Sequence, residues 1–287
     1  MARADVNGHR IDTADLGATV EDLYPLVMHE VLWALKLDQR RGAKWFAKLL
    51  MALPVRKFTR LLVELENAVA EGGTAYGARV LFKHFFSELK VTGADRIPKE
   101  GPLILAGNHP GGMDFVAEIG FSNRSDMMAV VSDVNFLRPL PVVSEHLAPV
   151  TQDPKTRFQA LKDTIQHLEK GGSILLYPTG SIDPDPHFFR NAREHIARWS
   201  RSLEVYLKRV PDVQIVPMIS SNVLHEKFLF NRLVLTQKYR LERQRAAEFL
   251  QTLNMMFFKG KRLNPMVSFG EVLRFPELNA TCADSLR

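Results

Sequence analysis

The first 90 residues carry apolar side chains at the three- and four-residue spacing of amphipathic helices. In residues 19–37 these positions are Val20, Leu23, Tyr24, Val27, Val31 and Leu35. Thr19 is followed three residues later by Asp22, which resembles a capping box with Asp in place of the usual Glu or Gln. A helix is therefore predicted to begin near Thr19.

Three more helical segments are predicted before residue 90. Residues 44–53 form the first, which is expected to break at Pro54. Residues 58–69 place Phe and Leu side chains on one face, and Gly72-Gly73 is expected to end that helix. The last of these helical segments is predicted to begin with residues 74–89. Residues 1–90 are therefore predicted to form an N-terminal helical segment.

The pattern changes near residue 91, where short apolar runs begin to alternate with helical segments. Runs typical of buried strands lie at residues 103–107, 127–131, 173–178, 213–220 and 266–270. Between them, Asp153 and Pro154 mark the start of a helix that Gly171-Gly172 ends. Strands separated by helices predict an α/β domain over residues 91–287.

Composition narrows the class of protein. Hydrophobic residues make up 46% and charged residues 24% of the 287 residues, as in ordinary globular proteins. The single cysteine, Cys282, excludes an internal disulfide and a multi-cysteine metal site, and fits a reducing compartment. No apolar stretch reaches the length of a secretory signal or a membrane-spanning helix, so the chain is not expected to span a membrane.

The net charge of +6 suggests an anionic partner. No stripe of aromatic and basic residues accompanies the charge, so nucleic acid is not expected. The N-terminal helices carry a large aromatic load, including Trp45 and Phe46. These rings fit either a helix-on-helix core or a membrane-interfacial face with Lys44 and Lys48 at the headgroups.

The segment "LILAGNHPGGMD", residues 103–114, holds the candidate chemistry. Ligands of α/β sheets gather at the carboxyl ends of strands, where His109 would lie. Gly111 and Gly112 allow a tight turn, after which Asp114 can fold back onto the imidazole and fix its tautomer. Such a histidine is a general base, although a glycine turn with a solvated histidine fits the same spacing.

The motifs from residue 91 to about 275 resemble the glycerophospholipid acyltransferase family, which includes lysophosphatidate acyltransferases. The Pro-x-x-Gly-Pro lead-in with Asn-His and Asp is similar to the family's first block. "LEKGGSILLYPTGSID" resembles its third block, "VQIVPMIS" its fourth, and "VSFGEVL" its closing strand. The Asn-His-Pro sequence is also similar to the ornithine-lipid and other atypical branches.

The resemblance implies an α/β fold whose central mixed sheet is flanked by helices, and an O-acyltransferase reaction. By match, His109 is the base that deprotonates an acceptor hydroxyl, and Asp114 orients it. The alkoxide attacks the thioester of acyl-CoA or acyl carrier protein, which are cosubstrates; no cofactor or metal is implied. Backbone N–H groups at Gly111 and Gly112, or at the start of the helix after Asp114, are candidate oxyanion donors. The expected setting is cytoplasmic, peripheral on the membrane that supplies the lipid acceptor.

The third block, which binds the acceptor phosphate in the family, departs from its usual Phe-Pro-Glu-Gly-Thr-Arg. Thr179 replaces the glutamate, Ile182 replaces the arginine, and Gly180 is retained. Backbone N–H groups at Gly180 and Ser181 are expected to hold an anion instead. Arg138 is the candidate for the acceptor headgroup or the CoA phosphates, against the alternative of an ordinary surface arginine.

Two alternatives to the acyltransferase follow from the same residues. A non-catalytic lipid- or acyl-carrier-binding relative of the same fold would explain the altered third block, although His109 and Asp114 both remain. The second alternative is a different hydrolytic or metal enzyme. The sequence does not support it, because it has no His-x-x-x-His, Cys-x-x-Cys or Gly-x-Ser-x-Gly motif.

Overall fold

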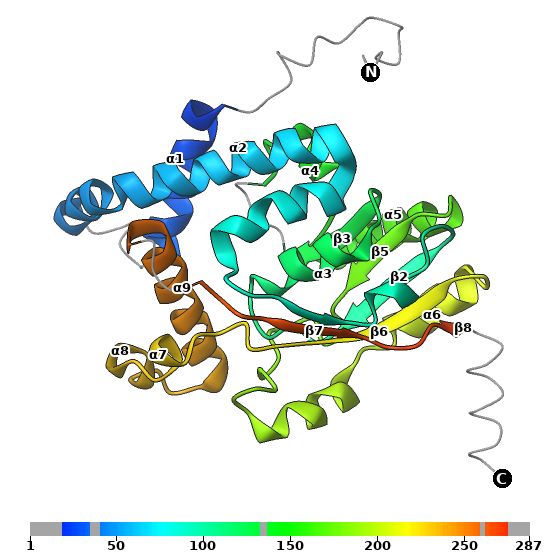
Figure 1. Ribbon diagram of the computed structural model, residues 1–287. Helices are drawn as coiled ribbons and strands as arrows, with labels where there is room; N and C mark the ends of the chain where they lie inside the picture. The colour runs from blue at the N-terminus through cyan, green and yellow to red at the C-terminus, as the bar shows by residue number, and fades with distance from the viewer. Residues whose placement is uncertain (1–18, 35–40, 133–136, 259–261, 275–287) are drawn as a thin grey trace, which may run out of the picture.

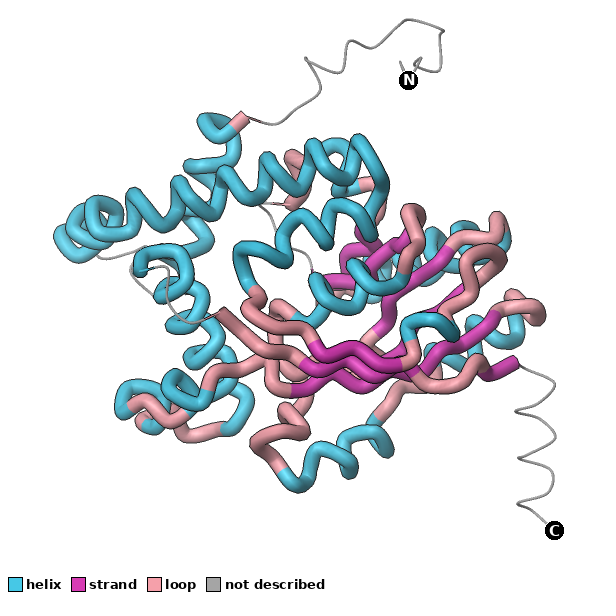
Figure 2. Tube along the Cα trace, viewed as in Figure 1, coloured by secondary structure: helices cyan, strands magenta, loops and turns pink. Residues whose placement is uncertain are grey.

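The fold is a central sheet with helices on both faces and an additional arm of helices at one side (Figure 1; Figure 2). The computed structural model describes residues 19–34, 41–132, 137–258 and 262–274. The expectations for residues 1–18 and for Cys282 lie outside these ranges.

The sheet has the mixed topology that the resemblance implied, which confirms that prediction. Its strands are β1 (Lys90–Thr92), β2 (Leu103–Gly107), β3 (Met127–Ser132), β4 (Leu147–Val150), β5 (Ser173–Leu176), β6 (Gln214–Ser221), β7 (Met266–Phe269) and β8 (Leu273–Arg274). Their order is β1-β7-β6-β2-β5-β3-β4, with β8 paired to β6. The β6–β7 and β6–β8 pairs are antiparallel and the others are parallel.

Strand β2 lies in the middle of the sheet and positions the candidate histidine. All five of its residues are buried, as the apolar run predicted, and it pairs in parallel with both β5 and β6. Leu103 and Leu105 belong to the core on one face, whereas Ile104 and Ala106 belong to the core on the other. Close packing on both faces and pairing with both neighbouring strands hold the carboxyl end of β2 in place.

The helices cover the two faces of the sheet and build the arm. They are α1 (Val20–Ala34), α2 (Arg41–Phe85), α3 (Asp114–Ser122), α4 (Pro141–Ser144), α5 (Pro154–Glu169), α6 (Ser202–Arg209), α7 (Glu226–Leu229), α8 (Arg232–Leu235) and α9 (Arg240–Phe258). Short 3₁₀ helices span Ala94–Arg96 and Arg190–Arg198. The predicted start of α5 is confirmed, because the Asp153 side chain accepts a hydrogen bond from the N–H of Lys155.

The predicted break at Pro54 is wrong, because α2 runs through this proline. A proline inside a helix costs about 3 kcal/mol, but packing can outweigh it. Met51 and Val55, on either side of Pro54, are buried in the core between α1 and α2. The predicted break at the glycine pair is confirmed, because Gly73 has a φ of 77° and leaves helical geometry.

Some aromatic residues of the N-terminal helices lie in a core and others are exposed, so each of the two predicted alternatives, a core and a membrane-interfacial face, describes part of them. Phe85 and Phe86 are buried in the core under the sheet. Trp45 and Phe46 are exposed at 69% and 62%. None of the helices in the described ranges combines the length and apolar character needed to cross a bilayer.

Glu66 connects the arm to the α/β domain. This carboxylate on α2 is buried and accepts hydrogen bonds from the N–H groups of Val142 and Val143 at 2.7 and 2.9 Å. These N–H groups belong to the first turn of α4, where a helix has no internal acceptors for them. Glu66 thus supplies the hydrogen-bond acceptors that the first turn of α4 lacks.

Glu66→Ala is expected to lower the free energy of unfolding by about 2 kcal/mol, because it leaves two buried N–H groups without an acceptor. Chemical denaturation followed by circular dichroism would measure the change. Glu71→Ala, an exposed position on the same helix, is the control and should change stability by less than about 0.5 kcal/mol. Equal effects of the two substitutions would contradict the proposed role of Glu66.

Candidate active site

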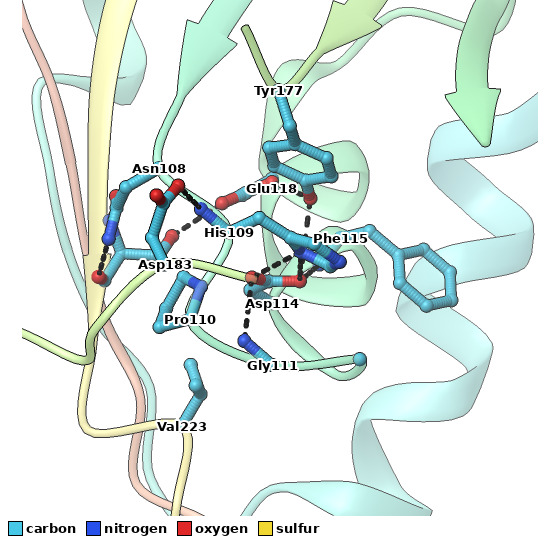
Figure 3. A network of polar contacts seen from close by, with 12 residues as sticks. Asn108, His109, Pro110, Gly111, Asp114, Phe115, Glu118, Tyr177, Asp183 and Val223 are labelled. Carbon is cyan, nitrogen blue, oxygen red and sulfur yellow. Dashed lines mark hydrogen bonds and ion pairs between the residues drawn. The ribbon is translucent and has the colours of Figure 1, made fainter. Parts of the chain in front are cut away.

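His109 and Asp114 meet at the carboxyl end of β2, as the sequence predicted (Figure 3). Nδ1 of His109 lies 3.0 Å from Oδ2 and 3.2 Å from Oδ1 of Asp114. The Asp114 side chain is fully buried, whereas the His109 side chain is 24% exposed. With Nδ1 turned to the carboxylate, Nε2 is the ring nitrogen left for a substrate.

The turn between the two residues is built to hold the carboxylate. Asp114 is the first residue of α3, and it accepts hydrogen bonds from the N–H groups of Gly111 at 3.3 Å and Phe115 at 2.7 Å. A side chain at Gly112 would collide with the carboxylate of Glu248. The short turn with its glycines therefore brings an acid five residues along the chain back onto the imidazole.

A second set of polar groups lies behind the dyad. Tyr177, directly after β5, stacks on the His109 ring with centroids 4.2 Å apart and planes at 16°. Its hydroxyl donates to Glu118 at 2.5 Å and lies 3.4 Å from Oδ1 of Asp114. The other carboxylate oxygen of Glu118 accepts from the Ser220 hydroxyl at 2.5 Å. Glu118 and Ser220 are both fully buried.

These carboxylates determine the charge of the imidazole. Burial by itself lowers the pKa of His109, but the charge of Asp114 and its hydrogen bond, then Glu118 and Glu248, outweigh burial and raise it from 6.5 to about 9. Burial, followed by the charge of Asp114, raises the pKa of Glu118 to about 8 and that of Glu248 to about 7. The ion pair of His109 therefore stabilises the fold fully below pH 6.5, and this contribution is lost as the pH rises through about 9.

The third block is joined to His109 through Asp183. The backbone N–H of His109 donates to Oδ2 of Asp183 at 3.0 Å, and the N–H of Asp183 donates to the carbonyl of His109 at 2.7 Å. The hydroxyl of Thr179 donates to the same Oδ2 at 3.0 Å. Oδ1 of Asp183 faces Nδ1 of His195 at 3.4 Å. The turn of the third block is thereby held beside the catalytic turn.

Helix α9 crosses the catalytic turn and binds it with two polar side chains. Nε2 of Gln244 donates to the carbonyls of Pro110 and Asp183 at 3.2 and 2.9 Å. Glu248 accepts a hydrogen bond from the N–H of Gly112. Since the N–H of Gly111 donates to Asp114, the N–H groups of both glycines already have an acceptor. An oxyanion at Gly112 would have to replace the Glu248 carboxylate.

The remaining predicted site residues lie at different distances along the sheet from His109. Gly180 has a φ of 62°, and its N–H donates to the carbonyl of Tyr177 at 2.9 Å, which closes the third-block turn. Ser181 is exposed in that turn. Arg138 is also exposed, but it follows β3, two strands from β2 in the sheet order.

Sequence reasoning missed several residues that shape the site. Glu118 lies four residues after Asp114 on α3, so helical spacing would have placed the two on one face. Asn108 was noted only as part of the motif; its side chain exchanges two 2.8 Å hydrogen bonds with the backbone of Ser220. Gln244 and Glu248 are more than 130 residues from the turn that they contact, and no local signal marks them.

These features place a histidine beside a buried carboxylate at the carboxyl edge of an α/β sheet, an arrangement that can act as a general base. Residues 88–221 match the model of the Acyltransferase family. The matched residues contain the Asn-His and Asp motif and the third and fourth blocks, which confirms the resemblance seen in these motifs.

The crystal structure of the 1-acyl-sn-glycerophosphate (LPA) acyltransferase PlsC from Thermotoga maritima is similar at 17% identity, over 93% of each chain, with a TM-score of 0.39. No curated protein matches the chain. The likeness to the family therefore rests on the motifs and on the match of residues 88–221.

Asp114→Asn is expected to lower the pKa of His109 by about one to three units, because it removes the nearest negative charge. Titration of the histidine ring resonances by NMR would measure the shift, with His109→Gln to assign the signal. Asp212→Asn, on an exposed loop before β6, is the charge-matched control. An unchanged titration in Asp114→Asn would show that the carboxylate does not govern the imidazole.

Proposed function

We propose that this protein is an O-acyltransferase that moves an acyl chain from acyl-CoA or acyl carrier protein to a hydroxyl of a lyso-glycerolipid or a similar lipid. The observation that carries the proposal is the contact of Nδ1 of His109 with the buried carboxylate of Asp114, which leaves Nε2 for an alcohol. The family match supports acyl transfer as the reaction.

In the proposed reaction, Nε2 of His109 takes the proton of the acceptor hydroxyl as its oxygen attacks the thioester carbonyl. The tetrahedral intermediate collapses, the carbon–sulfur bond breaks, and the departing thiolate takes the proton from the imidazolium. Asp114 stabilises the imidazolium while it exists. Because the pKa of His109 is raised to about 9, the rate should rise with pH as the ring loses its resting proton.

An acceptor with an anionic group fits the surroundings of the third block. Arg240 at the start of α9 interacts electrostatically with both Asp183 and Arg198. Arg240 is thus a cationic group that interacts with the third block, in which Ile182 occupies the position of the family's arginine. We infer that a guanidinium from α9 takes over recognition of the acceptor's negative charge.

His109→Ala is expected to lower the rate of acyl transfer by about 10²- to 10⁴-fold, because it removes the base. Labelled acyl-CoA and acyl carrier protein would be tested against lyso-phosphatidate, lyso-ornithine lipid and neutral lyso-lipid, with product scored by mass. His187→Ala, an exposed histidine, is the control. No product from the unaltered protein with any pair would favour the non-catalytic lipid-binding alternative, and full activity of His109→Ala would exclude the proposed mechanism.

We propose that the first part of α2 lies on an anionic bilayer, which makes the enzyme peripheral on the cytoplasmic side. Its exposed apolar residues recur along one face of the helix and are Trp45, Phe46, Leu49, Leu50 and Leu53. Lys48 is exposed among them. An apolar face with cations beside it suits the boundary between acyl chains and anionic headgroups. Such docking would bring the site to a lipid acceptor.

Replacing Trp45, Leu49 and Leu53 with Ser is expected to lower binding to vesicles containing anionic lipid by more than about tenfold, because less apolar area is buried. Flotation at low and high salt would measure binding, and salt should weaken the electrostatic part. Phe158→Ser is the control, since this ring on α5 is equally exposed at 69%. Loss of binding in the control alone would place the membrane face elsewhere.

A further inference from the structure

The second set of polar groups behind the dyad is more extensive than a histidine–aspartate pair requires. Tyr177 contacts three members of the site: its ring stacks on His109, and its hydroxyl lies between the carboxylates of Asp114 and Glu118. Glu118 has no exposed surface and is bonded through both oxygens, to Tyr177 and to Ser220. Tyr177 directly follows β5, Glu118 belongs to α3 and Ser220 belongs to β6, so the arrangement joins three parts of the fold. Figure 3 shows Tyr177 and Glu118 beside Asp114 and His109.

We propose that Glu118 and Tyr177 are positioning residues for the proposed acyl transfer, which hold Asp114 and the His109 ring in their working geometry and tune the basicity of the imidazole. The effect on acyl transfer rests on the proposed function. The structural basis is a chain of hydrogen bonds that runs Ser220–Glu118–Tyr177–Asp114–His109.

The protons in this chain can be counted from the contacts. When Glu118 is neutral, its own O–H can donate to the Tyr177 oxygen, and the Tyr177 O–H then points to Oδ1 of Asp114. When Glu118 is ionised, Tyr177 donates to Glu118, and Asp114 loses this donor. Glu118 therefore determines how many donors Asp114 has.

The charges that face Glu118 agree with this role. Burial and the charge of Asp114 favour its neutral form, whereas hydrogen bonds from Ser220 and Tyr177 and the charge of His109 favour its ionised form. Glu248, from α9, faces the same imidazole from the far side of the turn. An ionised Glu118 holds the proton on His109, and a neutral Glu118 releases it more easily.

The stacked ring supplies the second constraint. A ring plane at 16° to the imidazole limits rotation of His109 about its side chain, so that Nδ1 stays on Asp114. The same tyrosine thus fixes the acid by its hydroxyl and the base by its face. Loss of the hydroxyl and loss of the ring are separable by substitution.

Glu118→Gln is the central test, because glutamine has the same shape as the neutral acid and can bond both hydroxyls. It is expected to lower the pKa of His109 by about one unit, measured by NMR titration without substrate. The acidic limb of kcat/KM should move to lower pH by a similar amount, with KM unchanged. An unmoved His109 titration in a folded Glu118→Gln protein would overturn the inference.

Tyr177→Phe tests the hydroxyl while it keeps the stacked ring. It is expected to lower kcat about tenfold, as for the loss of one hydrogen bond, with KM unchanged. Tyr206→Phe is the matched control, because Tyr206 is also buried and its hydroxyl lies 2.8 Å from Thr164 in the core on the opposite face of the sheet. Equal losses of kcat in the two variants would reduce Tyr177 to a packing role and overturn its part of the inference.

The NMR titration of His109 tests this inference separately from the proposed function. If the protein transferred no acyl group to any acceptor, the proposed function would fail, yet the shift of the His109 titration in Glu118→Gln would still measure the coupling. If acyl transfer occurred without such a shift, the proposed function would stand and the coupling would be absent.

Discussion

The site depends on a carboxylate that has no exposed surface. A buried negative charge is costly unless it is paired and hydrogen-bonded. Asp114 meets that condition through the imidazole of His109 and through two backbone N–H groups of its own turn. The position of β2, the glycines and the start of α3 follow from this requirement, since a longer or stiffer turn would leave the charge without its partners.

Remote parts of the chain keep the turn in that shape. Asp183 holds the backbone of His109 from the third block, and Gln244 and Glu248, from α9, hold the backbone of Pro110 and Gly112. Each contact replaces water at a polar backbone group, so the turn is ordered although it belongs to no strand or helix. The reactive geometry is thus set by short-range chemistry and stabilised by long-range packing.

The sequence predicted what local patterns determine. The apolar run of β2, the glycine turn and the spacing of His109 and Asp114 all lie within twelve residues, and the structure brings the pair together. The predicted helix break at Pro54 was wrong, because the rule that proline ends a helix takes no account of the core around Met51 and Val55. Glu248 could not be predicted, since helical periodicity shows which face of α9 is buried but not which turn that face covers.

The acid and the base come from a single six-residue stretch, whereas the groups around them come from strands and helices far along the chain. The acid–base pair and the groups that surround it can therefore change independently in evolution. If the proposed function holds, substitutions in the third block or along α9 would change which alcohol is accepted while His109 and Asp114 stay intact. The loss of the usual glutamate and arginine beside an unaltered dyad is the kind of divergence that this separation permits.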